Sequence, residues 1–149
     1  MFERYTEDAR RTMFFARQAA TACGCVRIES EHLLLGLIRE GGPAVRDLVP
    51  SQTAEEIRRR IPEKKPEAAD LPLVMPLSDE CKWILAYAAD EADNLHHPQI
   101  AAEHLLLAIL REDSCSAARL LAESGAELNH LRQRVATDST RPDSREVSS

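Results

Sequence analysis

The apolar positions of this chain follow helical spacing, and one such pattern occurs twice. Residues 28–40 read Ile-Glu-Ser-Glu-His-Leu-Leu-Leu-Gly-Leu-Ile-Arg-Glu, and residues 100–112, 72 positions later, repeat eight of these thirteen residues. In the first copy Leu33, Leu34, Leu37 and Ile38 share one side of a helix. A long motif repeated at a fixed offset indicates a tandem duplication packed on itself.

A longer helix is predicted before each copy. The first extends from Thr6 to about Ala22 and the second begins after Ser78. Both carry apolar residues at intervals of four, three and four: Ala9, Met13, Ala16 and Ala20, then Cys81, Leu85, Ala88 and Ala92. The Thr6 and Ser78 hydroxyls can cap the two helices. Gly24 can end the first helix in the left-handed conformation, and His96 stands at the equivalent position.

Proline, glycine and serine divide the rest of the chain. We predict a third helix from Pro43 to Pro50, a fourth from Ser51 to Ile61, one starting at Ser114 or Ser116, and one from Glu127 to about Ala136. Ser30 is the predicted N-cap of the helix in the first motif, with Glu31 in its first turn.

These elements define the predicted domain organisation. Residues 1–62 form one four-helix repeat and residues 78–136 a second, joined by a proline-rich linker over 63–77 and followed by a disordered tail over 137–149. No segment alternates apolar and polar residues as a strand does. The expected fold is all-α, with eight helices and pseudo-twofold symmetry within one domain over 1–136.

Composition narrows the function classes. The 149 residues carry a formal net charge of −6, and their only basic run is Arg58–Arg60, so nucleic-acid binding is disfavoured. No window reaches the roughly 20 apolar residues of a membrane span. The charged start does not resemble a signal peptide, and a cytoplasmic location is the expectation.

The four cysteines, Cys23, Cys25, Cys81 and Cys115, include no C-x-x-C pair. We expect reduced thiols with structural or incidental roles, and neither a metal nor a cofactor. His96 and His97 lack a partner at ligand spacing, which favours loop packing over metal binding.

The opening Met1-Phe2-Glu3-Arg4-Tyr5-Thr6-Glu7, the doubled Glu-His-Leu-Leu-Leu block and its spacing resemble the amino-terminal repeat domain of Clp-type AAA+ unfoldases, particularly ClpC. The resemblance covers residues 2 to about 136. No G-x-x-x-x-G-K-[ST] sequence occurs, so ATP hydrolysis is not expected and the chain looks like a free-standing copy of the domain. In that family the domain binds substrates and adaptors for the unfoldase and its protease.

The resemblance further implies recognition of phosphoarginine in two related pockets, one per repeat. The glutamates used by the family correspond to Glu31 and Glu103. A carboxylate can accept two parallel N–H bonds from a guanidinium, and helix N-termini favour a phosphoryl group. Thr6, Ser78 and Ser30 could add hydroxyls. The family's usual Gly-Thr before Glu-His is replaced by Glu29-Ser30 and by Ala101-Ala102, which adds a negative charge in one copy and removes a hydroxyl in the other.

Other interpretations stay open on the sequence alone. Glu31 and Glu103 could simply favour their helix dipoles, and His32 and His104 could be core or interface groups that bond to another helix terminus. A small acid–base enzyme using the Glu-His pairs would need adjacent side chains, about 100° apart on a helix, to converge. A helical DNA-binding regulator is disfavoured by charge. The predicted partners are Clp components, adaptors or substrates, for which the chain could serve as adaptor, competitor or accessory subunit, as a monomer or weak dimer.

Overall fold

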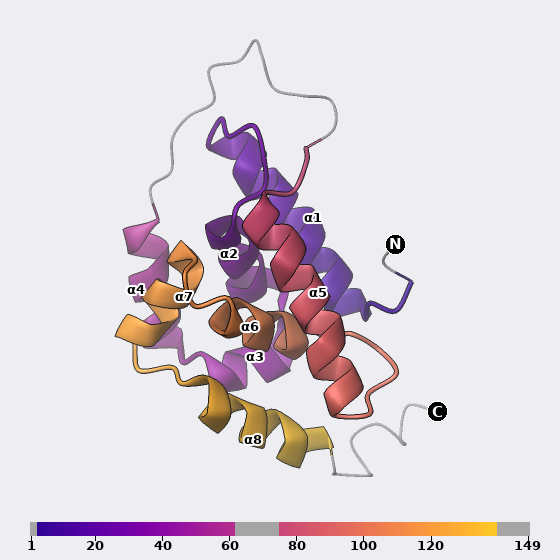
Figure 1. The fold of residues 1–149 in the computed structure, drawn as a ribbon. Coiled ribbons are helices and arrows are strands. Elements are labelled where there is room, and N and C mark those ends of the chain that lie inside the picture. The colour runs from indigo at the N-terminus through magenta and orange to yellow at the C-terminus, as the bar shows by residue number, and fades with distance from the viewer. Residues whose placement is uncertain (1–2, 62–74, 140–149) are drawn as a thin grey trace.

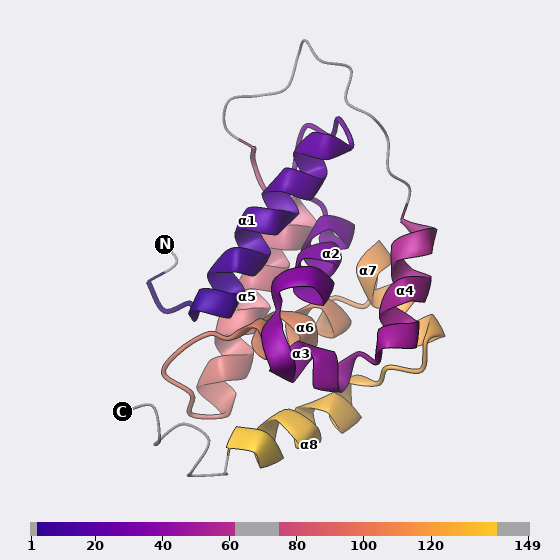
Figure 2. The same cartoon turned by 180° about the vertical axis from the view of Figure 1, so that it is seen from behind.

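The structure is a computed structural model that describes residues 3–61 and 75–139. Within these ranges the chain forms eight helices (Figures 1 and 2). They are α1 (Glu7–Ala22), α2 (Ser30–Glu40), α3 (Gly42–Leu48), α4 (Ser51–Arg60), α5 (Asp79–Asn94), α6 (Ala102–Arg111), α7 (Ser116–Glu123) and α8 (Leu128–Ser139). The all-α prediction is confirmed. None of these helices is long and apolar enough to cross a membrane.

The long helices α1 and α5 begin and end as their sequences predict. The Thr6 hydroxyl accepts a hydrogen bond from the Ala9 N–H at 3.3 Å, and the Ser78 hydroxyl accepts one from the Cys81 N–H at 3.2 Å. After each helix the chain turns through a left-handed residue, Gly24 with φ 76° and His96 with φ 59°. Histidine therefore adopts in the second repeat the conformation that glycine supplies in the first.

Helix α6 is the centre of the molecule. Every residue from Ala102 to Leu110 is buried, whereas α2, its counterpart, exposes part of its surface. Helices α1, α2 and α3 from the first repeat and α5, α7 and α8 from the second all contact α6 (Figure 1). A helix that is apolar on all sides must be enclosed by other elements. Because the helices that enclose α6 come from both repeats, the two repeats share one core.

The pseudo-twofold relation is visible in matching contacts. Two isolated parallel bridges join the repeats, Tyr5 with Ile100 and Ile28 with Leu77. The arginine of each motif lies over an aromatic ring of the preceding helix: Arg39 Cζ is 4.6 Å from the Phe15 ring centroid, and Arg111 Cζ is 4.4 Å from that of Tyr87. These pairs explain why arginine recurs near the end of the duplicated block.

Several predicted boundaries need correction. Ser30 is the first helical residue of α2 and Glu29 is its N-cap, while Ser51 is the first residue of α4 after the N-cap Pro50. Helix α8 continues to Ser139, past the predicted start of the tail at residue 137. Residues 62–74 of the predicted linker region and residues 140–149 of the predicted tail lie outside the described ranges.

Candidate ligand-binding site

The first candidate site lies where the N-termini of α2 and α7 meet. Ser116, the first residue of α7, donates from its hydroxyl to Glu31 Oε2 at 3.3 Å. The hydroxyls of Ser30 and Ser116 are 3.4 Å apart, and the Ala117 N–H donates to the Ser30 hydroxyl at 3.4 Å. Ser30 is buried and Glu31 is half-buried. The Ser30 hydroxyl therefore joins the two helix starts, while the Glu31 carboxylate remains partly open to solvent.

The N-terminus of α5 comes to the same place from the other repeat. The Ser78 N–H donates to the Ile28 carbonyl oxygen at 2.9 Å, and the Ile28 N–H donates to the Pro76 carbonyl oxygen at 2.8 Å. Ile28 is three residues before Glu31. Ser78 of the second repeat therefore lies beside the segment that leads to Glu31 of the first repeat.

The second candidate site repeats this exchange. The Thr6 N–H donates to the Ile100 carbonyl oxygen at 3.0 Å, and the Ile100 N–H donates to the Arg4 carbonyl oxygen at 2.8 Å. Thr6 thus lies beside the segment leading to Glu103, which is 9% exposed in the first turn of α6. The contacts between α3 and α6 and between α2 and α7 also cross the repeats. Backbone contacts at each candidate site therefore involve both repeats, and we call each one a composite site.

Negative charge distinguishes the two candidate sites. Burial raises the pKa of the Cys81 thiol to about 12; the hydrogen bond with Ser78 opposes the rise, and the charges of Glu29 and Glu80 add to it. Cys81 lies in the first turn of α5, so the charge of Glu29 acts on the helix start that belongs to the first site. Ala101 and Ala102 bring no such charge to the second.

The histidines of the duplicated motif cap their own helices. The Glu29 N–H donates to His32 Nδ1 at 2.9 Å, and the Ala101 N–H donates to His104 Nδ1 at 2.8 Å. Both rings are buried, as expected, although the predicted partner was the end of another helix. Burial lowers the pKa of His32, against the opposing effect of Glu31 and Glu29. With Nδ1 accepting a bond, the proton of a neutral ring is placed on Nε2.

In each repeat this Nε2 atom faces the turn that precedes the motif. His104 Nε2 is 2.7 Å from Nδ1 of the buried His97, so His97 packs within the loop as predicted, whereas His96 is exposed. His32 Nε2 is 3.4 Å from Cys23 Sγ.

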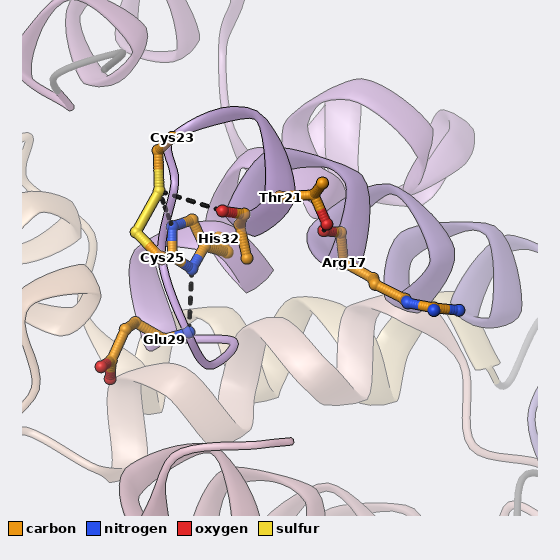
Figure 3. Close-up of a disulfide and its surroundings, with 7 residues drawn as sticks. Arg17, Thr21, Cys23, Cys25, Glu29 and His32 are labelled. Atoms are coloured by element: carbon orange, nitrogen blue, oxygen red, sulfur yellow. Dashed lines mark hydrogen bonds between the residues drawn. A yellow bond between two sulfur atoms is a disulfide. The ribbon is translucent and has the colours of Figure 1, made fainter. Parts of the chain in front are cut away.

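The prediction of reduced thiols is wrong for two of the four cysteines. Cys23 and Cys25 form a disulfide (Figure 3). Cys81 and Cys115 are free and buried. The sequence favoured thiols because the expected compartment is reducing, and the close approach within the turn was not visible in the spacing. Cys23, Cys25 and His32 together also place three potential metal-ligand atoms within 4.8 Å of one another.

A pocket that the sequence did not indicate lies away from both candidate sites. It has a volume of about 320 Å³ and opens between the end of α2 and helices α3 and α4. Its lining is mainly apolar, with arginine and glutamate at its edge: Ile38, Val45, Arg46, Val49, Ser51, Ala54, Glu55 and Arg58. The partial exposure of Ile38, predicted to be part of a buried stripe, follows from this opening.

Comparison with known proteins connects these features to a family. A model of the Clp repeat (R) N-terminal domain matches residues 76–148. The Bacillus subtilis (strain 168) protein described as the negative regulator of genetic competence ClpC/MecB is 34% identical over 137 residues, which are 91% of this chain and 17% of that protein. The chain belongs to the Clp repeat N-terminal domain family.

Solved structures agree with this assignment. The N-terminal domain of the chaperone ClpD from Arabidopsis thaliana has a TM-score of 0.69 and 26% identity, covering 93% of this chain and 96% of that one. The Hsp104 N-terminal domain from Candida albicans, at 18% identity and a TM-score of 0.66, shares the fold over 88% of each chain. The chain thus spans only the part of the Clp chaperones, 17% in the B. subtilis relative, that corresponds to this domain.

Proposed function

We propose that this Clp repeat domain is a non-enzymatic recognition module of Clp-dependent proteolysis and that it binds arginine-phosphorylated proteins. Membership of the Clp chaperone family supports an interaction module. The proposed partners are Clp components, adaptors and marked substrates. The proposed working compartment is the cytoplasm, as the sequence analysis predicted.

The observation that carries this proposal is the arrangement at the two composite sites. Each combines a glutamate in the first turn of one helix with a hydroxyl-capped helix start from the opposite repeat: Glu31 with Ser78, and Glu103 with Thr6. A carboxylate matches a guanidinium, and the N–H groups and dipole of a helix start favour a phosphoryl group. At the first site, Ser30 and Ser116 bring a further helix start beside Glu31.

Calorimetric titration with free phosphoarginine tests the proposal, with arginine and phosphoserine as control ligands. The variants are Glu31→Ala, Glu103→Ala and the double replacement. Asp113→Ala is the matched control because Asp113 is an exposed acidic residue that belongs to neither site. We expect saturable binding of phosphoarginine alone. Each single glutamate replacement should weaken its own site by about tenfold to a hundredfold, since a charge-assisted bidentate pair is lost.

The charge difference between the sites gives this experiment a second readout. Glu29→Ala should strengthen binding at the first site because it removes a carboxylate that repels the phosphoryl group. In the wild-type chain, the second site should bind phosphoarginine more tightly than the first site does. A folded wild-type chain that shows no saturable binding would refute the ligand proposal and leave docking to Clp proteins, measurable by pull-down, as the function to test.

The role of such a reader is decided by a degradation assay with an unfoldase, its protease and an arginine-phosphorylated substrate. An adaptor increases the rate of degradation, whereas a competitor that retains the substrate decreases it. An accessory subunit is instead expected to bind the unfoldase or protease in the absence of substrate.

A further inference from the structure

The turn between α1 and α2 brings two sulfur atoms of half-buried cysteines next to the buried imidazole of His32. Cys23 and Cys25 are half-buried and joined by a disulfide, and Gly24 between them is exposed (Figure 3). The candidate ligand sites do not include these two cysteines, although Cys25 packs against the edge of the core. Cys81 and Cys115, by contrast, are buried thiols whose pKa values burial raises, to about 12 for Cys81.

His32 is held with its N–H directed at one of the two sulfur atoms. Its Nδ1 accepts the Glu29 N–H at 2.9 Å, so its proton is on Nε2, which lies 3.4 Å from Cys23 Sγ (Figure 3). Such a donor stabilises a thiolate more than a thiol. The Ala20 carbonyl oxygen, 3.2 Å from the same sulfur, can accept a bond from the protonated thiol. The thiolate of Cys23 would therefore find a donor in His32, and the thiol would find an acceptor in the Ala20 carbonyl oxygen.

We propose that Cys23 and Cys25 form a thiol–disulfide exchange site that reacts with low-molecular-weight thiols, with Cys23 as the leaving group held by His32. Cys23 and Cys25 are both partly exposed. A disulfide that closes a loop of so few residues also constrains the unfolded chain little, which favours reversible reduction. In a reducing compartment disulfides are mostly transient and redox-active, which agrees with this assignment.

The reaction is a two-electron reduction by two thiol molecules, RSH. The first, as RS⁻, attacks Cys25 Sγ; a bond forms between these sulfurs, the Cys23–Cys25 bond breaks, and the electron pair leaves on Cys23 Sγ. The second RS⁻ attacks the R-bearing sulfur of the mixed disulfide, which releases RSSR and the Cys25 thiolate. The protons lost by the two thiols to solvent are balanced by those that the two cysteines take up.

The same geometry argues against a metal at this place. A metal bound by Cys23, Cys25 and His32 would need the lone pair of His32 Nε2, because Nδ1 already accepts the Glu29 N–H. A neutral imidazole has only one such lone pair, so metal binding would cost the cap of α2. Thiol exchange keeps this hydrogen bond intact.

The second repeat provides an internal control. His104 has the same cap and the same Nε2 orientation, but Nε2 faces His97 Nδ1, and Leu95 occupies the position of Cys23. His32→Glu should retain the cap, since a glutamate at this helical position can accept the N-cap N–H, while an ionised carboxylate offers no donor to Cys23. His104→Glu is the matched variant without a sulfur atom nearby.

The test equilibrates the purified chain with defined ratios of reduced and oxidised glutathione, traps the thiols by alkylation and counts them by mass spectrometry. We expect a reversible transition confined to Cys23 and Cys25 with unchanged circular dichroism. His32→Glu should shift the equilibrium toward the disulfide by about tenfold or more, because the thiolate loses one hydrogen bond to a charged group and gains a neighbouring negative charge. His104→Glu should leave the equilibrium unchanged.

Single-cysteine variants give the second measurement. In Cys25→Ser the remaining Cys23 should react with iodoacetamide at neutral pH roughly threefold faster than Cys25 does in Cys23→Ser, since a larger thiolate fraction outweighs its lower nucleophilicity. Equal rates, or a His32→Glu equilibrium equal to that of wild type, would overturn the role of His32. A disulfide that is reduced only on unfolding, or one equivalent of Zn²⁺ bound by the reduced chain through His32, would overturn the exchange site itself.

Discussion

Gly36 determines how closely α1 and α2 approach at the first motif. A Cβ atom added there would lie 2.5 Å from the Thr12 carbonyl oxygen, which belongs to the backbone and cannot turn aside. Helix propensity alone predicts that Gly36→Ala stabilises the chain by about 1 kcal/mol. We expect the opposite sign, a loss of about 1–3 kcal/mol from overpacking, measured by urea denaturation.

The counterpart of Gly36 in the second repeat is Ala108, which serves as the control. Ala108 is fully buried in α6, where the methyl group has room. Ala108→Gly should destabilise the chain by about 1 kcal/mol or more through lost helix propensity and packing. A more stable Gly36→Ala variant would contradict the close approach of α1 and α2. The sequence showed this pair only as a conservative difference, because the distance between two backbones depends on tertiary packing.

Helix α8 is attached to the core by a buried ion pair that the sequence did not indicate. Glu91 of α5 is 2% exposed and accepts two hydrogen bonds from Arg132, at 2.9 and 2.8 Å, and one from Arg111 at 3.1 Å. Glu91→Gln should lower the free energy of unfolding by about 2–3 kcal/mol, since it leaves two guanidinium groups without their shared carboxylate. Thermal or urea unfolding measures the loss.

The neighbouring residue Asp90 is the matched control for Glu91. Its carboxylate pairs with Arg111 at 2.6 Å but is half-exposed, so Asp90→Asn should cost about 1 kcal/mol or less. Equal losses for the two variants would contradict the dominant role of burial. Amide hydrogen exchange measures the attachment of α8 directly. When Glu91 is replaced, the exchange rate should increase in α8 before it increases in other helices.

The identity and order of the helices could be predicted from sequence, but the details of some helix starts could not. Thr6 and Ser78 cap as expected because the hydroxyl of an N-cap residue lies within reach of the backbone N–H three residues later. Ser30 has the same chemistry, yet His32 satisfies the N-cap N–H and the Ser30 hydroxyl bonds to the start of α7. The start of α7 is distant in sequence from Ser30. Local sequence reasoning therefore could not decide whether the Ser30 hydroxyl caps α2 or bonds to α7.

At the scale of the whole molecule, backbone contacts around the candidate site residues cross from one repeat to the other. Duplication predicts equivalent groups correctly, as the paired contacts of Thr6 and Ser78 demonstrate. It does not predict whether equivalent groups face their own repeat or the other one. The structure places each hydroxyl beside the motif of the opposite repeat, because the two bridges at Ile28 and Ile100 join the repeats to each other.

Because the core is shared, neither half should fold alone. Helix α6 is buried from Ala102 to Leu110 only when helices of both repeats surround it, and α2 contacts α7 from the other half. A fragment of residues 75–139 would expose the face of α6 that α1, α2 and α3 cover. Chains of about 60 residues already bury a smaller fraction of their surface than larger domains do, so this loss should prevent cooperative folding.

Circular dichroism of fragments 1–61 and 75–139, separately and mixed, tests the shared core. Each fragment alone should have low helicity and unfold without a sigmoidal transition, whereas an equimolar mixture should regain helicity in a concentration-dependent manner. The intact chain is the reference for full helicity. A fragment that unfolds cooperatively by itself would show that a repeat is an independent folding unit, and the composite sites would then depend on the docking of two preformed units.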